Sequence, residues 1–157
     1  QAEVEIAGPS GIKRLPLSEF YTGIGDNYRK LASNELLTRI FLPQSSAGYN
    51  GIYRKLRVRG SIDYPLAGVA LVMRRSNAHI ADARVAITAV NPAPLLVQGA
   101  AEALNGQSIT AELADKVGVL AAKTAKPLTT SALTPEYRRE MIRVFTKRAL
   151  LEVTGGG

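Results

Sequence analysis

The stretch that decides the fold spans residues 53–70 and reads YRKLRVRGSIDYPLAGVA. Its first half alternates as a strand does, with one mainly basic side. The sequence then becomes continuously apolar up to Met73, as in a buried strand, and Gly60-Ser61 forms the turn between the two. We therefore predict paired strands over 53–59 and 66–74. The basic side of the first would carry Tyr53, Lys55, Arg57 and Arg59.

This basic strand has two interpretations. It is either a solvated strand paired to a core strand, or a strand that directs Lys55 and Arg59 toward an anionic or electron-rich ligand. Composition alone favours the first interpretation and does not exclude the second.

The composition is that of a globular protein. The 157 residues are 46% hydrophobic and 21% charged, enough for one or two small domains with a real core. No apolar run approaches the ~18 residues of a membrane span, and no membrane partner is expected. The chain begins without Met or a signal-peptide pattern, inside a strand-like segment, as an excised or processed piece would.

The residue inventory excludes several kinds of chemistry. The absence of cysteine rules out disulfides, thiolate nucleophiles and iron–sulfur ligands in this chain, and it is compatible with a reducing compartment. The single histidine, His79, is predicted beside a hairpin turn. There is no nucleophile elbow, Walker A or G-x-G-x-x-G sequence, and no carboxylate pair stands out. The chain by itself is therefore not predicted to be an enzyme.

The charge balance is basic. Twenty Lys and Arg against 13 Asp and Glu give a net charge of +7, which suits nucleic acid, an acidic partner or a phosphate-bearing ligand. Only 6% of residues are aromatic, and they do not interleave with basic residues as in a stacking platform. Nucleic acid is therefore disfavoured.

The rest of the chain divides at a linker-like stretch, residues 44–50, where we place a domain boundary. Before it we expect a helical turn capped by Ser18, and strands over 2–7, 12–15 and 35–42. After it we expect a strand over 80–89, which with the strands over 53–59 and 66–74 makes an antiparallel meander. Helices are then expected over 94–104, 111–124 and 135–152. Thr110 and Thr134 are the predicted caps of the last two helices.

The last helix is predicted to have an apolar inner face and a basic outer face. The inner face would contain Tyr137, Met141, Val144, Phe145 and Ala149. The outer side chains, solvated or facing a partner, would be mainly Arg138, Arg139, Arg143 and Lys147. Strands followed by helices predict an α+β fold, with an antiparallel sheet of three strands and the three helices on one face.

The order of short motifs resembles a known family. Leu15-Pro16-Leu17, Glu19-Phe20, Gly23, Leu31, the run 35–40 and Pro43 resemble the end of the FAD-binding domain in molybdenum hydroxylase flavoproteins. Other motifs resemble the opening and continuation of the same proteins' C-terminal domain. They are Tyr53, Lys55-Leu56-Arg57, Arg59 and Ser61 before an apolar strand, then Asp82, Arg84-Val85-Ala86, Pro94, Ala101-Glu102, Leu104, Gly106, Tyr137-Arg138-Arg139 and Arg148-Ala149-Leu150. Members include xanthine dehydrogenase, carbon monoxide dehydrogenase and 4-hydroxybenzoyl-CoA reductase. By this pattern of motifs, the sequence is most similar to the 4-hydroxybenzoyl-CoA reductase branch.

The resemblance implies a three- to four-stranded antiparallel sheet with three helices, and with it a domain plan and a role. Residues 1–43 would be the tail of the FAD-binding domain, 44–50 a linker, 51–153 the C-terminal domain and 154–157 a disordered tail. The chain would be the C-terminal part of the FAD-containing electron-transfer subunit of a molybdenum-dependent oxidoreductase, forming one wall of the flavin cleft and a subunit contact. Its partners would be a molybdenum-cofactor subunit and an iron–sulfur subunit, or further copies of itself, in the cytoplasm.

The same resemblance implies site residues. Aligned through Pro43 without a gap, Lys55 matches a lysine that approaches the flavin, and Leu37 matches an apolar residue that packs against the cofactor. Arg59 and Asp63 match charged positions near that cleft. No catalytic residue or metal ligand is implied in this chain.

Two departures from the family pattern matter. The family's glycine-rich segments that hold the FAD pyrophosphate lie N-terminal to anything in this sequence, so we expect this chain alone not to retain FAD tightly. The family also usually has an Asp before the last helix, where this sequence reads Pro127-Leu128-Thr129-Thr130. The docking of that helix is therefore open.

Two other functions stay open at this point. One is a non-enzymatic binding module for nucleic acid or an acidic protein, with a patch of Arg54, Lys55, Arg57 and Arg59. The other is an assembly domain that contacts partner subunits through the Arg-rich last helix.

Overall fold

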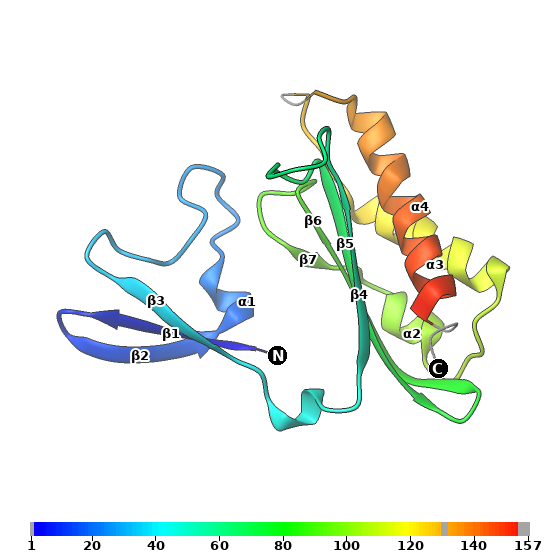
Figure 1. Ribbon diagram of the computed structural model, residues 1–157, viewed down its shortest axis with the longest axis horizontal. Helices are drawn as coiled ribbons and strands as arrows, with labels where there is room; N and C mark the ends of the chain where they lie inside the picture. The colour runs from blue at the N-terminus through cyan, green and yellow to red at the C-terminus, as the bar shows by residue number, and fades with distance from the viewer. Residues whose placement is uncertain (1, 130–131, 154–157) are drawn as a thin grey trace. The chain divides into compact units, whose positions relative to one another are not determined.

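The computed structural model describes residues 2–129 and 132–153. The chain divides into two compact units, residues 1–48 and 49–157, and each is built on its own antiparallel sheet. The ribbon in Figure 1 shows the elements of both units in chain order. The predicted tail at 154–157 lies outside the described residues.

The first unit is a three-stranded sheet with a short helix. The strands lie in the order β2-β1-β3 around a small apolar cluster of Val4, Ile6 and Phe20. The strand predictions are confirmed to within about two residues at each end. The helical turn starts one residue early, after Pro16, and Ser18 does not cap it. The elements are β1 (Glu3–Gly8), β2 (Gly11–Pro16), α1 (Leu17–Phe20) and β3 (Leu36–Phe41).

Glu5, in the middle of β1, is a buried carboxylate with three polar neighbours. Its side chain is bonded by Arg14 Nη2 at 3.2 Å and by Thr38 Oγ1 at 3.0 Å, and Arg39 Nε lies 3.8 Å away. Burial raises the pKa of Glu5, but the hydrogen bonds from Thr38 and Arg14 and the charges of Arg39 and Arg14 together hold it below its ordinary value. The charged form is therefore the one that this sheet accommodates.

The second unit contains a four-stranded sheet in the order β4-β5-β6-β7, and Figure 1 shows all its helices on one side of that sheet. Each neighbouring pair is antiparallel. Alternate side chains of β5 and β6, among them Val69, Leu71, Val85 and Ile87, are buried under the helices. The α+β prediction is confirmed. A short 3-10 helix (Gln44–Ser46) precedes the strands β4 (Asn50–Leu56), β5 (Ala67–Ser76), β6 (His79–Thr88) and β7 (Leu95–Leu96).

Three strand ends in the second unit differ from the prediction by two residues or more, and the first is the start of β4, at Asn50 instead of Tyr53. β4 stops at Leu56 instead of running to Arg59, because residues 57–66 form a loop organised around a carboxylate described below. β5 continues to Ser76, and Asn77, whose φ is 55°, forms the turn before β6. Asparagine tolerates this left-handed conformation better than most residues.

The predicted helix over 94–104 is wrong in its first half. Leu95 and Leu96 instead form strand β7, paired with Ile87 and Ala86, because the outer edge of β6 offers unpaired main-chain groups there. The helix α2 covers only Ala100–Leu104 and starts after Gly99, whose φ is 77°. A local Pro and Leu pattern does not reveal this tertiary pairing.

The other two helices begin at their predicted caps. The Thr110 side chain accepts from the Leu113 amide at 3.2 Å, and Thr134 accepts from the Tyr137 amide at the same distance. Each bond satisfies an N-terminal amide that has no partner within the helix. The helices are α3 (Ala111–Thr124) and α4 (Pro135–Val153).

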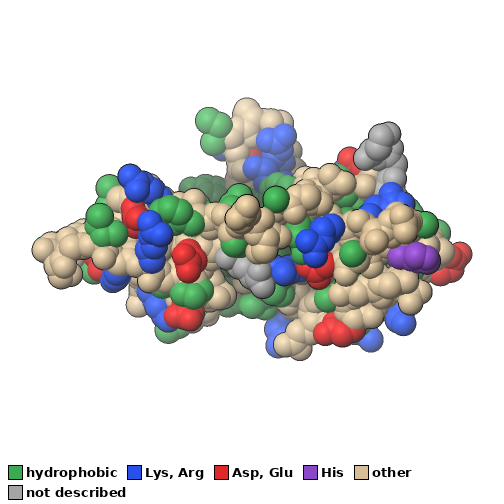
Figure 2. Space-filling view, turned by 90° about the horizontal axis from the view of Figure 1, so that it is seen from below, with side chains coloured by type: hydrophobic (Ala, Val, Ile, Leu, Met, Phe, Trp, Pro, Cys, Tyr) green, Lys and Arg blue, Asp and Glu red, His purple; other side chains and the backbone are tan. Residues whose placement is uncertain are grey.

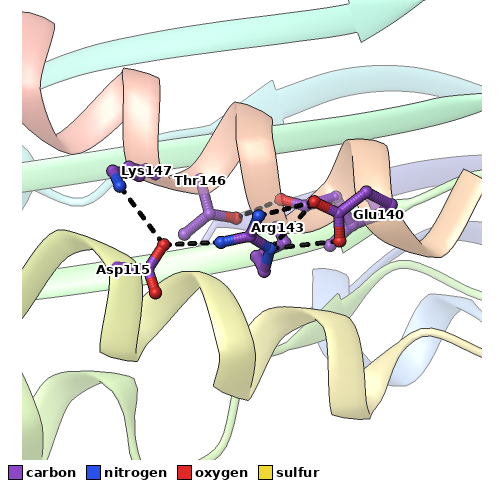
Figure 3. A network of polar contacts seen from close by, with 6 residues as sticks. Asp115, Glu140, Arg143, Thr146 and Lys147 are labelled. Carbon is purple, nitrogen blue, oxygen red and sulfur yellow. Dashed lines mark hydrogen bonds and ion pairs between the residues drawn. The ribbon is translucent and has the colours of Figure 1, made fainter.

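The two long helices approach closely at a glycine and are joined by charges. A Cβ on Gly118 of α3 would lie 2.8 Å from the main-chain oxygen of Arg143, so α4 can approach α3 this closely only where no side chain intervenes. Figure 3 shows the Arg143 guanidinium between Asp115, at 2.5 Å, and Glu140, at 2.6 Å. Lys147 reaches the same Asp115 oxygen at 3.3 Å.

The predicted faces of α4 need correction. Tyr137 is exposed, Arg143 and Lys147 are half-buried beside α3, and Arg138 is buried. Met141, Phe145 and Ala149 of the predicted inner face do pack in or against the core. The Arg138 guanidinium is also inside, where it finds main-chain acceptors. The buried positions are Arg138, Ile142, Thr146, Ala149 and Leu150. Among the residues that the structure describes, no helix has the length and apolar character needed to cross a membrane.

Candidate functional site

The candidate site begins on the face of the second sheet that its helices do not cover. The register places Lys55 beside Gly68, and Gly68 beside Thr88. Two residues before Lys55 on the same strand, Tyr53 pairs with Ala70. Because these side chains alternate with the buried ones, Lys55 and Tyr53 project from the same surface above a floor of small residues.

Tyr53 lies across Gly68. A Cβ on Gly68 would be 2.9 Å from the Tyr53 hydroxyl and 2.6 Å from the Thr88 methyl group, so only glycine leaves room for this arrangement. The Tyr53 side chain is about half exposed, and its partial burial raises the pKa of the phenol. The ring therefore borders Lys55 as a neutral, largely apolar group at physiological pH.

A structured loop, residues 57–66, follows Lys55 and is closed by Asp63. One carboxylate oxygen of Asp63 accepts hydrogen bonds from the amides of Val58 at 3.0 Å and Arg59 at 3.2 Å. The amides of Arg59, Val58 and Tyr64 and the Arg59 charge hold the pKa of Asp63 below its ordinary value. The loop thus holds a fixed negative charge at its base.

Lys55 and Arg59 contact Asp63 only loosely. Lys55 Nζ lies 3.4 Å from the main-chain oxygen of Asp63, and Arg59 Nε lies 3.9 Å from its carboxylate. An exposed ion pair at that distance contributes little stability. Both cations are therefore available to a ligand without breaking a strong internal bond.

The exposed part of the loop is apolar as well as basic. Ile62 is 93% and Tyr64 is 89% exposed, and Val58 is also open to solvent. A neutral aromatic ring, a cation and small floor residues suit the edge of a planar, electron-rich group. The site offers no acid–base pair, and the described residues contain no group of three possible metal ligands.

The structure brings together three of the four predicted site residues. Lys55, Arg59 and Asp63 share the end of β4 and its loop. Leu37 belongs to β3 in the other unit, where it is partly buried against the Val4 cluster. The neighbours Tyr53 and Gly68 were not predicted as site residues, although a glycine inside an apolar strand indicates a close approach of this kind.

The four cations near β4 do not form one patch. Arg54 points to the helix side, where it pairs with Glu152, whereas Lys55 points to the opposite side. Arg57 lies beyond the strand end. On the surface shown in Figure 2, basic side chains occur in separate groups with acidic ones between them. Nothing in this arrangement favours a nucleic-acid surface.

Residues 51–153 match the family model described as the CO dehydrogenase flavoprotein C-terminal domain. The chain belongs to this family. The matched range contains the sheet of the second unit, its helices and the loop that follows Lys55. The resemblance inferred from the order of motifs is therefore confirmed.

Relatives extend the match beyond that domain. The chain is 29% identical over 150 residues to the carbon monoxide dehydrogenase medium chain of Hydrogenophaga pseudoflava, covering 96% of this chain and 51% of the relative. It is 24% identical to the xanthine dehydrogenase FAD-binding subunit of Escherichia coli O157:H7, over 96% of this chain and 51% of that subunit.

A solved structure agrees. A carbon monoxide dehydrogenase from Hydrogenophaga pseudoflava that lacks the Mo-pyranopterin moiety of the molybdenum cofactor superposes with a TM-score of 0.86 at 30% identity. The match covers 99% of this chain and 53% of that one. The chain thus spans about half the length of the relatives that it matches.

Proposed function

We propose that this chain is the C-terminal part of the FAD-containing electron-transfer subunit of a molybdenum-dependent oxidoreductase. One observation supports this proposal most directly. The sheet within the range that matches the family model presents Lys55 on the face without helices, beside Tyr53 and the loop that Asp63 holds. Residues 1–43 would then be the end of the FAD-binding domain, 44–50 the linker and 51–153 the C-terminal domain. In this role Leu37 is an apolar contact of the cofactor, and Arg59 and Asp63 lie near it.

The residues present fit a flavin. Bound FAD would supply the electron transfer, and this chain would supply charge and shape around it. A lysine ammonium near the ring favours the form that has gained negative charge, and so raises the reduction potential. Tyr53 and Thr88 fill the space over Gly68, so the contact that this surface offers to the cofactor is the Lys55 ammonium with the Tyr53 ring next to it.

The relatives' names support a multi-subunit setting. A medium chain implies larger and smaller companions, so we propose a molybdenum-cofactor subunit and an iron–sulfur subunit as partners, in the cytoplasm. The exposed side chains Tyr137 and Arg148 of α4 belong to a surface that such a partner could contact. The 4-hydroxybenzoyl-CoA reductase branch and homo-oligomer formation stay predictions.

The test is Lys55→Met in the intact flavoprotein. Methionine keeps most of the packing of the lysine stem and removes its charge. At an effective dielectric constant between those of water and the protein interior, the variant should lose ~1–2 kcal/mol of stabilisation of the anionic reduced flavin. The reduction potential of the flavin should therefore fall. The potential is measured by spectrophotometric redox titration, together with FAD content and metal content, which should stay near those of the wild type.

Arg57→Met is the matched control. It removes a charge two residues away that lies beyond the end of β4 and has no place in the proposed contact. An unchanged potential in Lys55→Met, or an equal effect of Arg57→Met, would show that the basic segment is only a solvated surface.

A further inference from the structure

Arg138, in the first turn of α4, is a buried cation whose three guanidinium nitrogens hold three separate segments. The residue is 6% exposed. Nε donates to the main-chain oxygen of Leu66 at 2.8 Å, Nη1 to that of Leu128 at 3.0 Å, and Nη2 to that of Ala89 at 2.6 Å. Such a fan of bonds needs the planar fork of arginine, because a lysine ammonium carries all its donors on one nitrogen and cannot reach three acceptors spaced around a guanidinium.

Leu66 is the closing residue of the 57–66 loop. Its amide donates to the main-chain oxygen of Leu56 at 2.8 Å, where β4 ends, and its own oxygen accepts from Arg138. The base of the loop is therefore tied on one side to β4 and on the other to α4. Both Lys55 and Asp63 lie within three residues of these tied positions.

Ala89 is the residue that follows β6, and it has a φ of 67°. This left-handed conformation costs an alanine roughly 1–2 kcal/mol, so something must hold it. The bond from Arg138 to the Ala89 oxygen does so. Thr88, the preceding residue, pairs with Gly68 in the row that contains Lys55.

Leu128 lies in the segment before α4, where the family usually has an aspartate. Here the main-chain oxygen of Leu128 accepts from Arg138, and α4 packs on β5 and β4. The departure from the family sequence therefore leaves the last helix docked. The same guanidinium links that segment to the loop and to the end of β6.

We infer that Arg138 is a positioning residue. From the helix side of the sheet it holds the closing end of the 57–66 loop at Leu66 and the end of β6 at Ala89. It thereby sets the positions of Lys55 and Asp63 on the other side of the sheet. The flavin part of this inference rests on the proposed function. The hold on the loop does not, and it can be measured without the cofactor.

The experiment compares Arg138→Lys with the wild type by hydrogen exchange of the intact protein. Lysine keeps the charge and the stem but not the three bonds. Exchange of the loop amides, residues 57–66, should become about tenfold faster or more, while the β5 and β6 segments 69–73 and 83–87 change by less than about twofold. Arg139→Lys is the control. Among the described residues, the Arg139 side chain donates one long hydrogen bond, 3.4 Å, to the main-chain oxygen of Ala125, and the loop should be unaffected.

Three results would overturn the inference. Unchanged loop exchange would mean that Arg138 does not hold the loop. Equally faster exchange throughout the second unit, or failure of the variant to fold, would mean that Arg138 serves general stability only.

A redox titration separates this inference from the proposed function. The flavin potential of Arg138→Lys should shift in the same direction as that of Lys55→Met, by a smaller amount. A shift in Lys55→Met with none in Arg138→Lys would overturn the positioning role. No shift in either variant would refute the proposed flavin contact, and the exchange result alone would then decide whether Arg138 holds the loop.

Discussion

The Tyr53 hydroxyl lies 2.9 Å from the point that a Cβ on Gly68 would occupy. A tyrosine on the edge strand thus lies over a glycine on the next strand, directly beside Lys55. A cross-strand pair of this kind both packs the sheet surface and shapes what can approach it.

We predict that Gly68→Ala destabilises the second unit by ~1–3 kcal/mol, because the new methyl group overpacks a filled space. The Thr88 methyl, 2.6 Å from the added Cβ, is the closest obstacle, and the Tyr53 hydroxyl is the next. Chemical denaturation followed by circular dichroism measures the loss.

Thr88→Ser supplies the matched test of that mechanism. Serine removes the interfering methyl group and keeps the hydroxyl, so the double variant should recover part of the loss in a double-mutant cycle. A Gly68→Ala protein as stable as the wild type, or a loss that Thr88→Ser does not reduce, would contradict the proposed crowding.

Local signals in the sequence were enough for much of the second unit. Thr110 and Thr134, each followed by a helical pattern, placed the starts of α3 and α4 correctly, because capping depends on a few neighbouring residues. The apolar run through Met73 identified β5, since this run of residues is enough to predict a buried strand between two neighbouring strands. The basic strand pattern offered Lys55 and Arg59 as ligand contacts only beside the alternative of a solvated strand, and the resemblance then indicated Lys55 as a contact of the flavin.

The errors share a different physical origin, which is competition for main-chain hydrogen bonds by groups outside the predicted element. β4 ends early because Asp63 captures the amides of Val58 and Arg59. Leu95 becomes a strand residue because β6 has a free edge. Arg138 is buried because three carbonyl oxygens meet at its guanidinium, which charge patterning along one helix cannot show.

Glu5 gives the first unit a predictable response to acid. Its folded pKa lies below the ordinary value of 4.5, so its contribution to stability is complete above that value and is lost as pH falls through the lower folded pKa. Glu5→Gln should therefore destabilise the sheet at pH 7, and the difference from the wild type should narrow as the solution is acidified below 4.5.

Hydrogen exchange of the β1 and β3 segments, read at several pH values, measures this difference locally. Comparison of variant with wild type at each pH removes the contribution of Glu35, whose pKa is also lowered, chiefly by the Ala32 amide and by Lys13. A difference that stays constant from neutral to acid pH would show that the Glu5 charge does not stabilise the sheet.

Asp63 is predicted to order the 57–66 loop through its amide bonds and not through its ion pair. Asp63→Ala leaves the amides of Val58 and Arg59 without their acceptor, so the loop should open more often. Trypsin cleavage after Arg57 reports this opening, and we expect it to be about tenfold faster or more in the variant.

Arg59→Gln removes only the exposed contact at 3.9 Å, and it should change the cleavage rate by less than about twofold. Equal acceleration in the two variants would assign the order of the loop to the ion pair, and no acceleration in Asp63→Ala would mean that the carboxylate does not hold the loop that follows Lys55.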